Sequence, residues 1–490
     1  MEQRLFATVG LLIFAVTLPP FGALVCGTIV VIQIAPMALR PLIACLPARP
    51  PSAARNSAPP WFSVHVATHC EPHLLVTATL RALLDQDWPA DSYEIIVMDN
   101  NTAEPALWKP VERFRAAHPG RIRFLHRTGV KGAKAGALNI ALDHADLRAT
   151  HIVTVDADYV VARDFLHRAA AALHKTGADY VQFPQSYTGT AIAAPGIDAE
   201  LEEYFRTNAA KAGEAEAVLL TGTLCVISRA ALVAAGRWSG VTTTEDAELG
   251  VRLCNGGYSG RFINQIVGKG LLPLLLRDLE KQRYRWCSGN AQTLCRHARM
   301  IFTAAGSLTL AKRLVILSQL TAWFNLALVP FVLLTAWLLT GQGHTIAALL
   351  AGCAIVLSLC DIVMRVLARG WRDGLPLGIV LRALACRIAL APPSAKATFD
   401  AVTGTPLTFI VTDKTGGSAR SGTDAPQCAL VLCILALFLL VTVRPTDPVI
   451  LAALGALGAL MLPLPAAILT IRSLRVYRDA VMLPPGRAVA

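Results

Sequence analysis

The chain is poor in charged residues and has no cysteine pattern that would hold a metal. Only 16% of its 490 residues are charged, which is too few for an ordinary soluble enzyme. The 12 cysteines are scattered and form no Cys-X-X-Cys pair, so a zinc site and a disulfide framework are disfavoured and a reducing compartment is expected. The net charge of +12 comes without a basic run containing aromatic residues, so no nucleic acid is expected as a partner.

Long apolar segments are present instead, and hydrophobic residues make up 54% of the chain. A helix needs about 20 apolar residues to cross a bilayer, so these segments predict an all-α transmembrane bundle of about six helices. The segments are 5–18, 21–46, 314–340, 345–367, 427–443 and 448–471.

The first two apolar segments are separated by Pro19 and Pro20. Because proline interrupts a helix, they form either two helices or one long kinked helix. A cleaved signal peptide is the competing interpretation, but the start of the chain is barely positive and has no evident cleavage site, so retained anchors are expected. Arg40, Arg49 and Arg55 follow, which predicts that the next domain is cytoplasmic.

In the middle of the chain, short apolar strands alternate with helices. This pattern follows a linker rich in Pro, Ala and Ser at 47–60 and extends over 61–268. Strands are predicted at 63–68, 94–98, 122–126 and 151–155, and helices at 73–86 and 133–145. Such alternation predicts an α/β domain with a parallel, nucleotide-binding type of sheet, whose ligands lie at the carboxyl ends of the strands.

The rest of the chain is predicted to be associated with the membrane. Residues 269–300 are expected to hold an amphipathic helix at the interface, and 301–471 the transmembrane bundle. Within the bundle we expect a second interfacial helix at 375–390 and a polar loop at 391–426. The remaining parts are an N-terminal membrane region at 1–46 and a cytoplasmic tail at 472–490.

Two carboxylates follow the fourth predicted strand, in the sequence Asp156-Ala157-Asp158. In an extended chain the side chains at i and i+2 share a face. Mg²⁺ takes few carboxylate oxygens and keeps its other positions for water and phosphate, so the pair suits a metal that carries a diphosphate. Alone, this pattern is more often a solvated turn, and its interpretation depends on the other motifs.

Polar residues also end the first two strands, and a basic segment begins a helix. Thr68, Glu71 and Asp99 follow these strands and can bind a base or ribose, although such residues are also common in turns. Lys134 lies in a Lys-Gly-Ala-Lys-Ala-Gly segment at a helix start, where N–H groups and positive charge favour an anion such as a diphosphate. The spacing is not that of a P-loop, and a solvated helix start is the alternative.

Three later motifs offer a base and a ligand-binding face. Residues 221–223 form a Thr-Gly-Thr turn, and 244–246 are Thr-Glu-Asp, whose carboxylates can accept a proton from a hydroxyl, although adjacent acids also begin helices. Gln282, Arg285 and Trp286 stand at i, i+3 and i+4 on one helix face. The arginine can steady a departing diphosphate and the indole offers a flat surface to a sugar ring; a membrane anchor is the alternative.

The order of these motifs resembles that of a known family. Asp99, Asp156-Ala157-Asp158, Thr244-Glu245-Asp246 and Gln282-Arg283-Tyr284-Arg285-Trp286 resemble the D, DxD, TED and QxxRW signature of processive family 2 glycosyltransferases. The resemblance implies an α/β domain of the glycosyltransferase-A type, with a Rossmann-like mixed sheet, inserted in the membrane bundle. It also implies an inverting transfer from a UDP-sugar that builds a β-linked polymer.

The resemblance assigns roles to individual residues. Asp246 would be the catalytic base, with Glu245 and Thr244 beside it. The nucleotide sugar would be bound by Thr68, Glu71, Asp99, Lys134, Asp156, Gln282 and Arg285. The acceptor would be bound by Trp286, Thr221, Gly222 and Thr223, and Mg²⁺ or Mn²⁺ would be held by Asp156 and Asp158.

A further stretch resembles a loop of the bacterial cellulose synthase catalytic subunits. It runs from Phe409 to Lys414 and is similar to their F-x-V-T-x-K gating loop, so Phe409, Val411, Thr412 and Lys414 would close over UDP. This likeness implies UDP-glucose as the donor and a nascent polysaccharide that crosses the lipid bilayer of a bacterial inner membrane. Periplasmic export subunits are candidate partners.

Departures from the cellulose synthase pattern leave the linkage open. Asn100 replaces an acid, Thr221 and Thr223 replace Cys and Ser, and the first motif carries His69 and Cys70. A β-1,4, β-1,3 or mixed linkage is compatible, and the tail is too short for the PilZ domain that binds cyclic di-GMP. The alternatives are a hyaluronan- or chitin-type synthase that uses UDP-N-acetylglucosamine, and an inert membrane transport or scaffold protein, against which the intact acids weigh.

Overall fold

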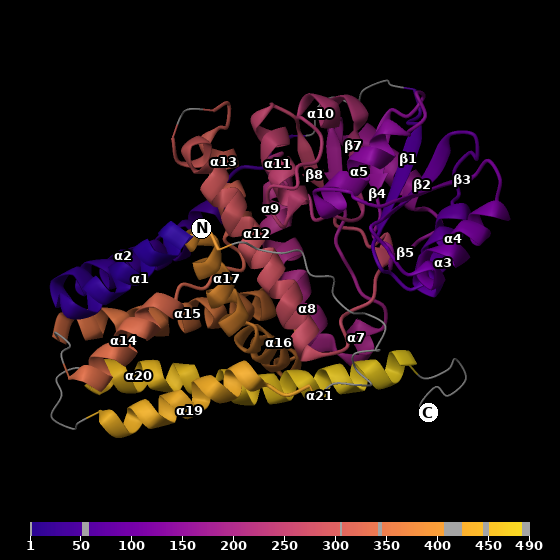
Figure 1. Ribbon diagram of the computed structural model, residues 1–490. Helices are drawn as coiled ribbons and strands as arrows, with labels where there is room; N and C mark the ends of the chain where they lie inside the picture. The colour runs from indigo at the N-terminus through magenta and orange to yellow at the C-terminus, as the bar shows by residue number, and fades with distance from the viewer. Residues whose placement is uncertain are drawn as a thin grey trace.

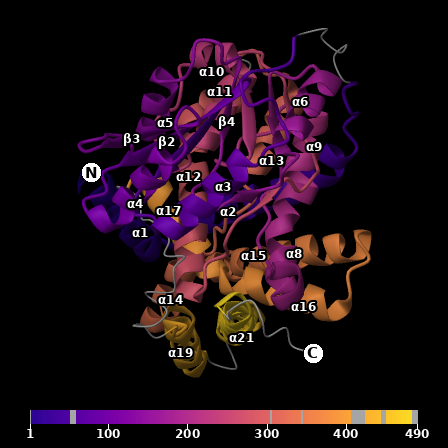
Figure 2. The same ribbon diagram turned by 90° about the vertical axis from the view of Figure 1, so that its right-hand side faces the viewer.

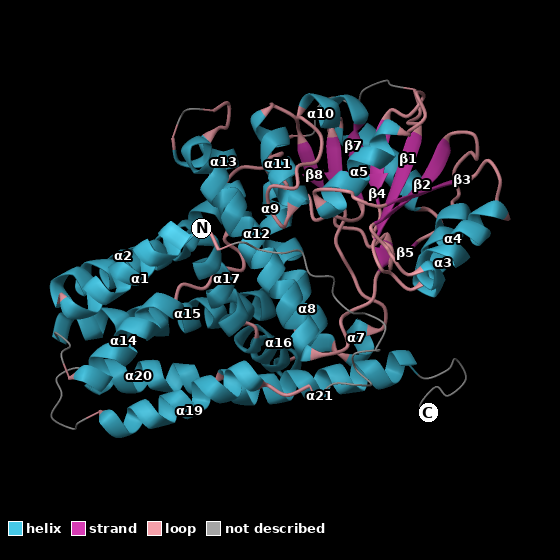
Figure 3. Cartoon of the chain, viewed as in Figure 1, coloured by secondary structure: helices cyan, strands magenta, loops and turns pink. Residues whose placement is uncertain are grey.

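The segment of alternating strands and helices and the long apolar segments form two adjoining parts of the molecule. The structure is a computed structural model that describes residues 2–50, 58–303, 306–341, 345–405, 424–443 and 450–482. Within this part of the chain, all strands lie between Phe62 and Lys269, in an α/β domain at the upper right of Figure 1. Long helices gather at the lower left, and Figure 3 shows that the sheet is confined to the α/β domain.

Seven strands form a mixed sheet in the order β3-β2-β1-β4-β7-β6-β8. They are β1 Phe62–Thr68, β2 Tyr93–Asn100, β3 Ile122–Arg127, β4 His151–Thr154, β6 Tyr180–Gln182, β7 Cys225–Ser228 and β8 Gly260–Phe262. The four predicted strands, β1 to β4, are confirmed and pair in parallel. Because β7 runs antiparallel to β4 and β6, the sheet is mixed, which confirms the predicted fold class. The carboxyl ends of β1, β2 and β4 therefore meet at one edge.

Both faces of the sheet are buried, as the unbroken apolar runs of its strands require. On β2, Ile95 and Val97 pack with one core cluster and Ile96 and Met98 with the other, so successive side chains point to opposite faces. The first face is covered by α3 His73–Leu84, α4 Pro105–Ala116 and α6 Phe165–Thr176. The second is covered by α5 Ala133–Asp143, α10 Arg229–Ala234 and α11 Glu245–Asn255.

Two helical segments connect the α/β domain to the bundle. The first comprises α7 Thr190–Ala193, α8 Pro195–Glu203, a π-helical turn Tyr204–Ala209 and α9 Ala210–Glu214. In it, α8 lies against α16 Leu377–Ala389 of the bundle (Figure 2). The second is α12 Leu276–Phe302, which confirms that a helix lies in the predicted segment 269–300 and packs against both α11 and α17 Ala391–Thr403.

The bundle contains apolar helices of membrane-spanning length. Within the described residues, the candidates by length and composition are Pro19–Ala44, Thr345–Arg372, Leu377–Thr403 and Ala453–Val481. The N-terminal segments are two helices, α1 Glu2–Thr17 and α2 Pro19–Ala44, because Pro19 and Pro20 begin the second one. The remaining helices are α13 Leu310–Leu320, α14 Leu328–Thr340, α15 Thr345–Arg372, α19 Gln427–Thr442, α20 Ile450–Met461 and α21 Pro463–Met482.

The span predicted at 314–340 is wrong, because the chain breaks between α13 and α14. The Ala322 carbonyl accepts hydrogen bonds from Arg387 (2.5 Å) and Arg365 (3.3 Å), and Asn325 Oδ1 accepts the Ala327 N–H (2.9 Å). These contacts satisfy backbone groups outside the helical pattern, so the helix can end inside an apolar segment. None of them can be read from the hydropathy of the segment.

The loop predicted at 391–426 is wrong for its first 13 residues, which form helix α17. Its two prolines occupy the first helical turn, where a missing N–H costs nothing. Together with α16 it forms a stretch long enough to span, rather than the interfacial helix predicted at 375–390. The charge of Arg387 is accommodated because Glu200 pairs with it.

The tail predicted at 472–490 is helical in its first part, because α21 continues to Met482. Leu474 and Tyr477, three residues apart, are both fully buried in a core shared with α7 and α8, so this end of the helix is held by tertiary packing. In Figure 1, α21 extends along the bottom of the molecule to a position beneath α7. The predicted gating residues Phe409, Val411, Thr412 and Lys414 lie outside the described residues.

Candidate active site

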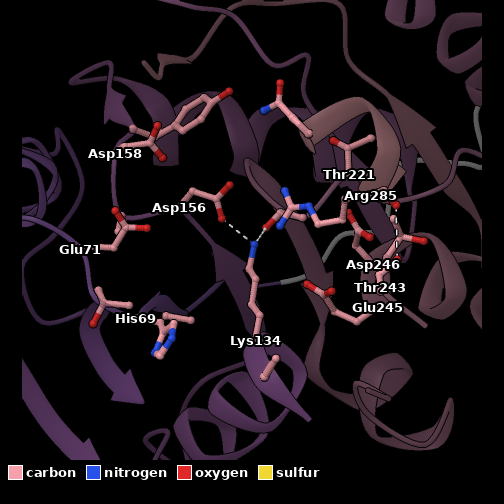
Figure 4. Close-up of a pocket in the computed structure, with 18 of the residues that line it drawn as sticks. His69, Glu71, Lys134, Asp156, Asp158, Thr221, Thr243, Glu245, Asp246 and Arg285 are labelled. Atoms are coloured by element: carbon pink, nitrogen blue, oxygen red, sulfur yellow. Dashed lines mark hydrogen bonds and ion pairs between the residues drawn. The ribbon is translucent and has the colours of Figure 1, made fainter. Parts of the chain in front are cut away.

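The predicted motifs converge on one cavity of about 360 Å³ at the carboxyl edge of the sheet (Figure 4). Most of the predicted site residues line it, namely Thr68, Glu71, Lys134, Asp156, Asp158, Thr221, Gly222, Thr244, Glu245, Asp246, Gln282, Arg285 and Trp286. The strand ends form one side of the cavity and α12 forms the other. The structure therefore brings together motifs that are more than 200 residues apart, since Thr68 and Trp286 both line the cavity.

Lys134 lies in the first turn of α5 and reaches into the middle of the cavity (Figure 4). Gly132, with φ of 83°, adopts a left-handed conformation that begins this helix. The Lys134 Nζ donates to Asp156 Oδ1 (2.5 Å) and to the Gly222 carbonyl (2.8 Å). Burial lowers the pKa of Lys134, but the negative charges of Asp156 and Glu245 outweigh it and raise the pKa. The side chain therefore remains a cation that can face a diphosphate.

Asp156 and Asp158 follow β4 and line the same cavity, as predicted from their spacing. The Asp156 N–H donates to Thr223 Oγ1 (3.0 Å), and Asp158 Oδ2 accepts the Leu271 N–H (3.2 Å). The described residues contain no cluster of three or more side chains that would ligate a metal by themselves. Two carboxylates beside a roomy cavity instead fit a hard cation that takes its other ligands from phosphate and water.

Asp246 lies at the start of α11, where its Oδ1 accepts the Ala247 N–H (2.8 Å). A Cβ on Gly222 would lie 2.9 Å from Asp246 Oδ2, and Gly222 has φ of 80°, so only glycine fits this turn against the carboxylate. Burial and the charge of Glu245 raise the pKa of Asp246 to about 7, although Lys134 and Arg285 act in the opposite direction. A carboxylate with this pKa is suited to accept a proton near neutral pH.

The α12 face predicted from the i, i+3, i+4 spacing is confirmed, because Gln282, Arg285 and Trp286 all line the cavity. Within the part of the chain that the structure describes, Gln282 Oε1 is buried without a hydrogen-bond partner, and the same holds for Thr221 Oγ1. Buried polar atoms without partners are costly, so these two are available to a ligand.

The loop that carries Asp246 is held directly on α12. A Cβ on Gly289 would lie 2.6 Å from the Thr244 side chain, so the missing side chain lets the loop approach the helix. Thr243 adds two hydrogen bonds, from its N–H to Gln292 Oε1 (3.1 Å) and from its hydroxyl to the Arg285 carbonyl (3.3 Å). The loop that carries Asp246 and the helix α12 are therefore held together. Gly289, a glycine inside a helix, is the sequence signal of this contact.

A second cavity of about 60 Å³ shares Asp246, Trp286 and Thr221 with the first. Three aromatic side chains that do not line the first cavity, those of Tyr204, Phe205 and Trp323, contribute to its lining together with aliphatic residues and Asn290. The Trp323 ring lies 5.7 Å from Tyr204 and 5.8 Å from Trp286, measured between centroids. Aromatic faces provide large apolar surfaces with few degrees of freedom, and such a cavity beside Asp246 fits a sugar ring.

A buried ionic cluster holds Trp323 in place. The guanidinium groups of Arg283 and Arg387 lie 4.0 and 4.4 Å from the centre of its ring. Both arginines donate to Glu200, at 2.8 Å and 2.9 Å, and Arg283 and Glu200 are only 1% exposed. Burial raises the pKa of Glu200, but the two arginine charges outweigh it and lower the pKa. Trp323 was missed from the sequence because its importance depends on these contacts.

Two predicted site residues, Asp99 and Thr223, do not line the cavity. Asp99 accepts hydrogen bonds from Thr68 Oγ1 (2.8 Å) and Thr102 Oγ1 (2.8 Å), and its other oxygen lies 2.7 Å from His126 Nδ1. Asp99 thus accepts a hydrogen bond from the cavity residue Thr68, and Thr223 accepts one from the backbone of the cavity residue Asp156. Residues that line the cavity but were not predicted as site residues include His69, Asn101, Tyr159, Gln185, Tyr187 and Thr243.

Of these, Gln185 and Tyr187 follow β6 in the same way that the predicted residues follow β1, β2 and β4. Strand β6 has only three residues and was not predicted, so its polar continuation was missed. A search for polar residues directly after short apolar runs would have found both.

Comparisons with known proteins agree with this geometry. Residues 63–234 match the family Glycosyl transferase family 2, and residues 151–359 match Glycosyl transferase family group 2. A cellulose synthase catalytic subunit [UDP-forming] of Xanthomonas axonopodis pv. citri is 29% identical over 242 residues, which is 48% of this chain and 32% of that protein. Glucomannan 4-beta-mannosyltransferase 7 of Arabidopsis thaliana is 30% identical over 231 residues, which is 46% of this chain and 41% of that protein.

A solved structure has the same fold. A mannosyltransferase from Pyrobaculum calidifontis, in complex with GDP-Man and Mn²⁺, superposes with a TM-score of 0.54 at 18% identity, covering 79% of this chain and all of that one. The α/β part of the chain is therefore a glycosyltransferase domain of the glycosyltransferase-A type. Between residues 63 and 359 the chain matches two models of family 2 glycosyltransferases, and it resembles the cellulose synthase catalytic subunits. It spans less than half the length of the Xanthomonas and Arabidopsis proteins.

Proposed function

We propose that the chain is a processive, inverting β-glucan synthase that transfers glucose from UDP-glucose and moves the polymer across the membrane. The observation that best supports this is the place of Asp246, which borders both cavities. On one side lie Lys134, Asp156 and Asp158, which suit a nucleotide diphosphate. On the other side lie Trp286 and Trp323, which suit an acceptor sugar.

The polar groups of the larger cavity divide between the parts of the donor. Thr68, Glu71 and the Asn100–Asn101 turn lie at the ends of β1 and β2, where a base and ribose would bind. The Gln282 and Thr221 oxygens that have no partner among the described residues would bind sugar or phosphate groups. In this assignment Asp99 positions Thr68, and Thr223 positions Asp156.

In the reaction, a hydroxyl of the acceptor attacks the anomeric carbon of the donor. Asp246 takes the hydroxyl proton, the new bond forms between the acceptor oxygen and that carbon, and the bond from the carbon to the diphosphate oxygen breaks. The charges of Lys134 and Arg285 offset the negative charge on the departing UDP. Because attack and departure occur on opposite faces, a single displacement inverts the anomeric carbon and produces a β linkage.

Asp156 and Asp158 would hold Mg²⁺ or Mn²⁺, whose charge would neutralise part of the diphosphate. This assignment is supported by the carboxylate oxygens of the two residues, which suit a hard cation, and by the space beside them in the cavity. The Pyrobaculum mannosyltransferase with the same fold was solved with Mn²⁺.

The apolar helices support a multi-pass location in a bacterial inner membrane, with the α/β domain in the cytoplasm. The lipid bilayer and the nascent polysaccharide would then be partners of the bundle, and periplasmic export subunits could receive the polymer. The residues 409–414 would close over UDP, in keeping with their resemblance to a gating loop.

The test is the product made by membranes that contain the chain. With radiolabelled UDP-glucose and Mg²⁺ we expect an insoluble glucan, and digestion with glucanases specific for β-1,4 or β-1,3 bonds identifies the linkage. Incorporation only from UDP-N-acetylglucosamine would instead assign a hyaluronan- or chitin-type synthase, and incorporation only from GDP-mannose a mannan synthase. Absence of incorporation and of nucleotide binding would favour an inert membrane protein.

A further inference from the structure

The end of α21 reaches the loop that holds Asp158. This loop, residues 268–272, follows β8 and begins with the short strand β9 Gly268–Lys269, which pairs with β5 Val160–Val161 directly after Asp158. Within the loop, the Leu271 N–H donates to Asp158 Oδ2 (3.2 Å). The next N–H, that of Leu272, donates to the hydroxyl of Tyr477 on α21 (3.2 Å). Two neighbouring peptide groups thus join the carboxylate to the last helix.

The remaining contacts hold the other parts of the loop. The Gly270 N–H donates to the Ser186 carbonyl (2.9 Å), and the Gly270 carbonyl accepts the Thr188 N–H (2.9 Å). Among the described residues, pairing with β5 and hydrogen bonds to the 186–188 segment hold residues 268–270 in place. The Leu272 N–H is instead bound by the Tyr477 hydroxyl. The loop is therefore anchored on both sides of the amide that binds Asp158.

Tyr477 is buried where α21 meets this loop. It is 0% exposed and packs in one core with Leu272, Leu474 and Tyr187. Its ring lies close to Gly189, where an added Cβ would be 3.9 Å from Tyr477 Cε2. Leu272 is 1% exposed, so water cannot replace the hydroxyl as acceptor for its N–H. Loss of the hydroxyl leaves that amide buried and unpaired, and the loop must shift to recover a partner.

We infer that Tyr477 is a positioning residue for the cation-binding carboxylate, through which the last membrane helix sets the geometry of the donor site. The inference rests on the proposed function, because Asp158 is there assigned to a divalent cation carrying UDP. The Leu271 amide holds one oxygen of Asp158, which leaves the other oxygen to face such a cation, and Tyr477 fixes the next peptide. A movement of α21 would therefore reach the donor site through one hydrogen bond.

The experiment measures UDP binding by calorimetry to the purified full chain, with MnCl₂ and with EDTA. We expect Tyr477→Phe to weaken Mn²⁺-dependent binding about threefold to tenfold, less than the ~10–100-fold effect of a residue that touches a metal ligand. Binding in EDTA should not change. Tyr93→Phe is the matched control, because it removes a buried hydroxyl that donates to the Leu83 carbonyl (3.1 Å), and it should bind as the wild type does.

A double-mutant cycle with Asp158→Asn tests the route of the effect. If Tyr477 acts through Asp158, its substitution changes nothing further once the carboxylate is gone. Unchanged Mn²⁺-dependent binding in Tyr477→Phe overturns the inference, as does an equal loss in EDTA or an additive loss in the double variant. Wild-type binding that ignores Mn²⁺ would instead overturn the cation assignment of the proposed function, and the inference with it.

Discussion

The Nζ of Lys134 lies 2.5 Å from Oδ1 of Asp156 and joins the start of α5 to the carboxylate pair that follows β4. The same Nζ donates to the Gly222 carbonyl (2.8 Å), in the turn that borders Asp246. One cation thus connects the carboxylate pair with the turn beside Asp246. Its charge offsets two acids in the free protein and is available to the diphosphate when the donor binds.

Replacement of Lys134 by Met should weaken UDP binding about 10-fold to 100-fold, since hydrogen bonds to charged groups contribute about 1.5–3 kcal/mol and 1.4 kcal/mol is a factor of ten. Calorimetry with UDP measures the loss. Lys131→Met is the control, because Lys131 is exposed and lies three residues earlier. An equal loss in both variants would show a general effect of charge and no specific contact.

The activity should rise with pH as Asp246 loses its proton. Burial and the charge of Glu245 raise the pKa of Asp246 to about 7, so below this pH the carboxyl is protonated and cannot accept the acceptor proton. We expect kcat/KM for glucan formation to increase between about pH 6 and about pH 8 and then to level. A profile that is flat over this range, measured at constant ionic strength, would contradict the role of Asp246.

Gly289→Ala should lower the rate of transfer without weakening UDP binding. An added Cβ would lie 2.6 Å from the Thr244 side chain and 2.7 Å from its backbone nitrogen, so the loop that carries Asp246 must shift. Gly378→Ala is the matched control, since a Cβ there meets nothing within 4 Å and Gly378 also lies in a helix. Full activity of Gly289→Ala would show that the base tolerates this displacement.

Glu200→Gln should destabilise the folded chain by about 3–5 kcal/mol, because it leaves two buried arginines without their carboxylate. The lower pKa of Glu200 in the protein means that the carboxylate form is the stabilising one. The midpoint of thermal unfolding measures the loss. Glu214→Gln, which removes an ion pair with a 48% exposed carboxylate, should cost about 0–1 kcal/mol. Similar midpoints for the two variants would contradict the structural role of the Glu200 cluster.

The sequence predicts the elements whose signals are local. Strands β1 to β4 follow from runs such as Ile95 to Met98, and α5 follows from its glycine and lysine start. The motif residues were also found, because polar groups at parallel strand ends must meet. Even the shared face of Gln282, Arg285 and Trp286 follows from helical spacing alone.

Features that depend on tertiary contacts could not be predicted. The break before α14 exists because distant arginines bond the Ala322 carbonyl, and α17 forms at the start of a segment predicted to be a polar loop. Trp323 and Tyr477 have no local motif, and each gains its role from partners far away in the chain. Asp99 was assigned to the ligand from its strand end, yet its oxygens are engaged by neighbouring side chains.

The most direct test of the account compares Asp246→Asn with the wild type in two measurements on the same purified chain. We expect UDP to bind both proteins with similar affinity, while incorporation of radiolabelled glucose from UDP-glucose falls by about 10²–10⁴-fold in the variant, the range typical of a lost general base. Incorporation by Asp246→Asn at the wild-type rate would contradict the account.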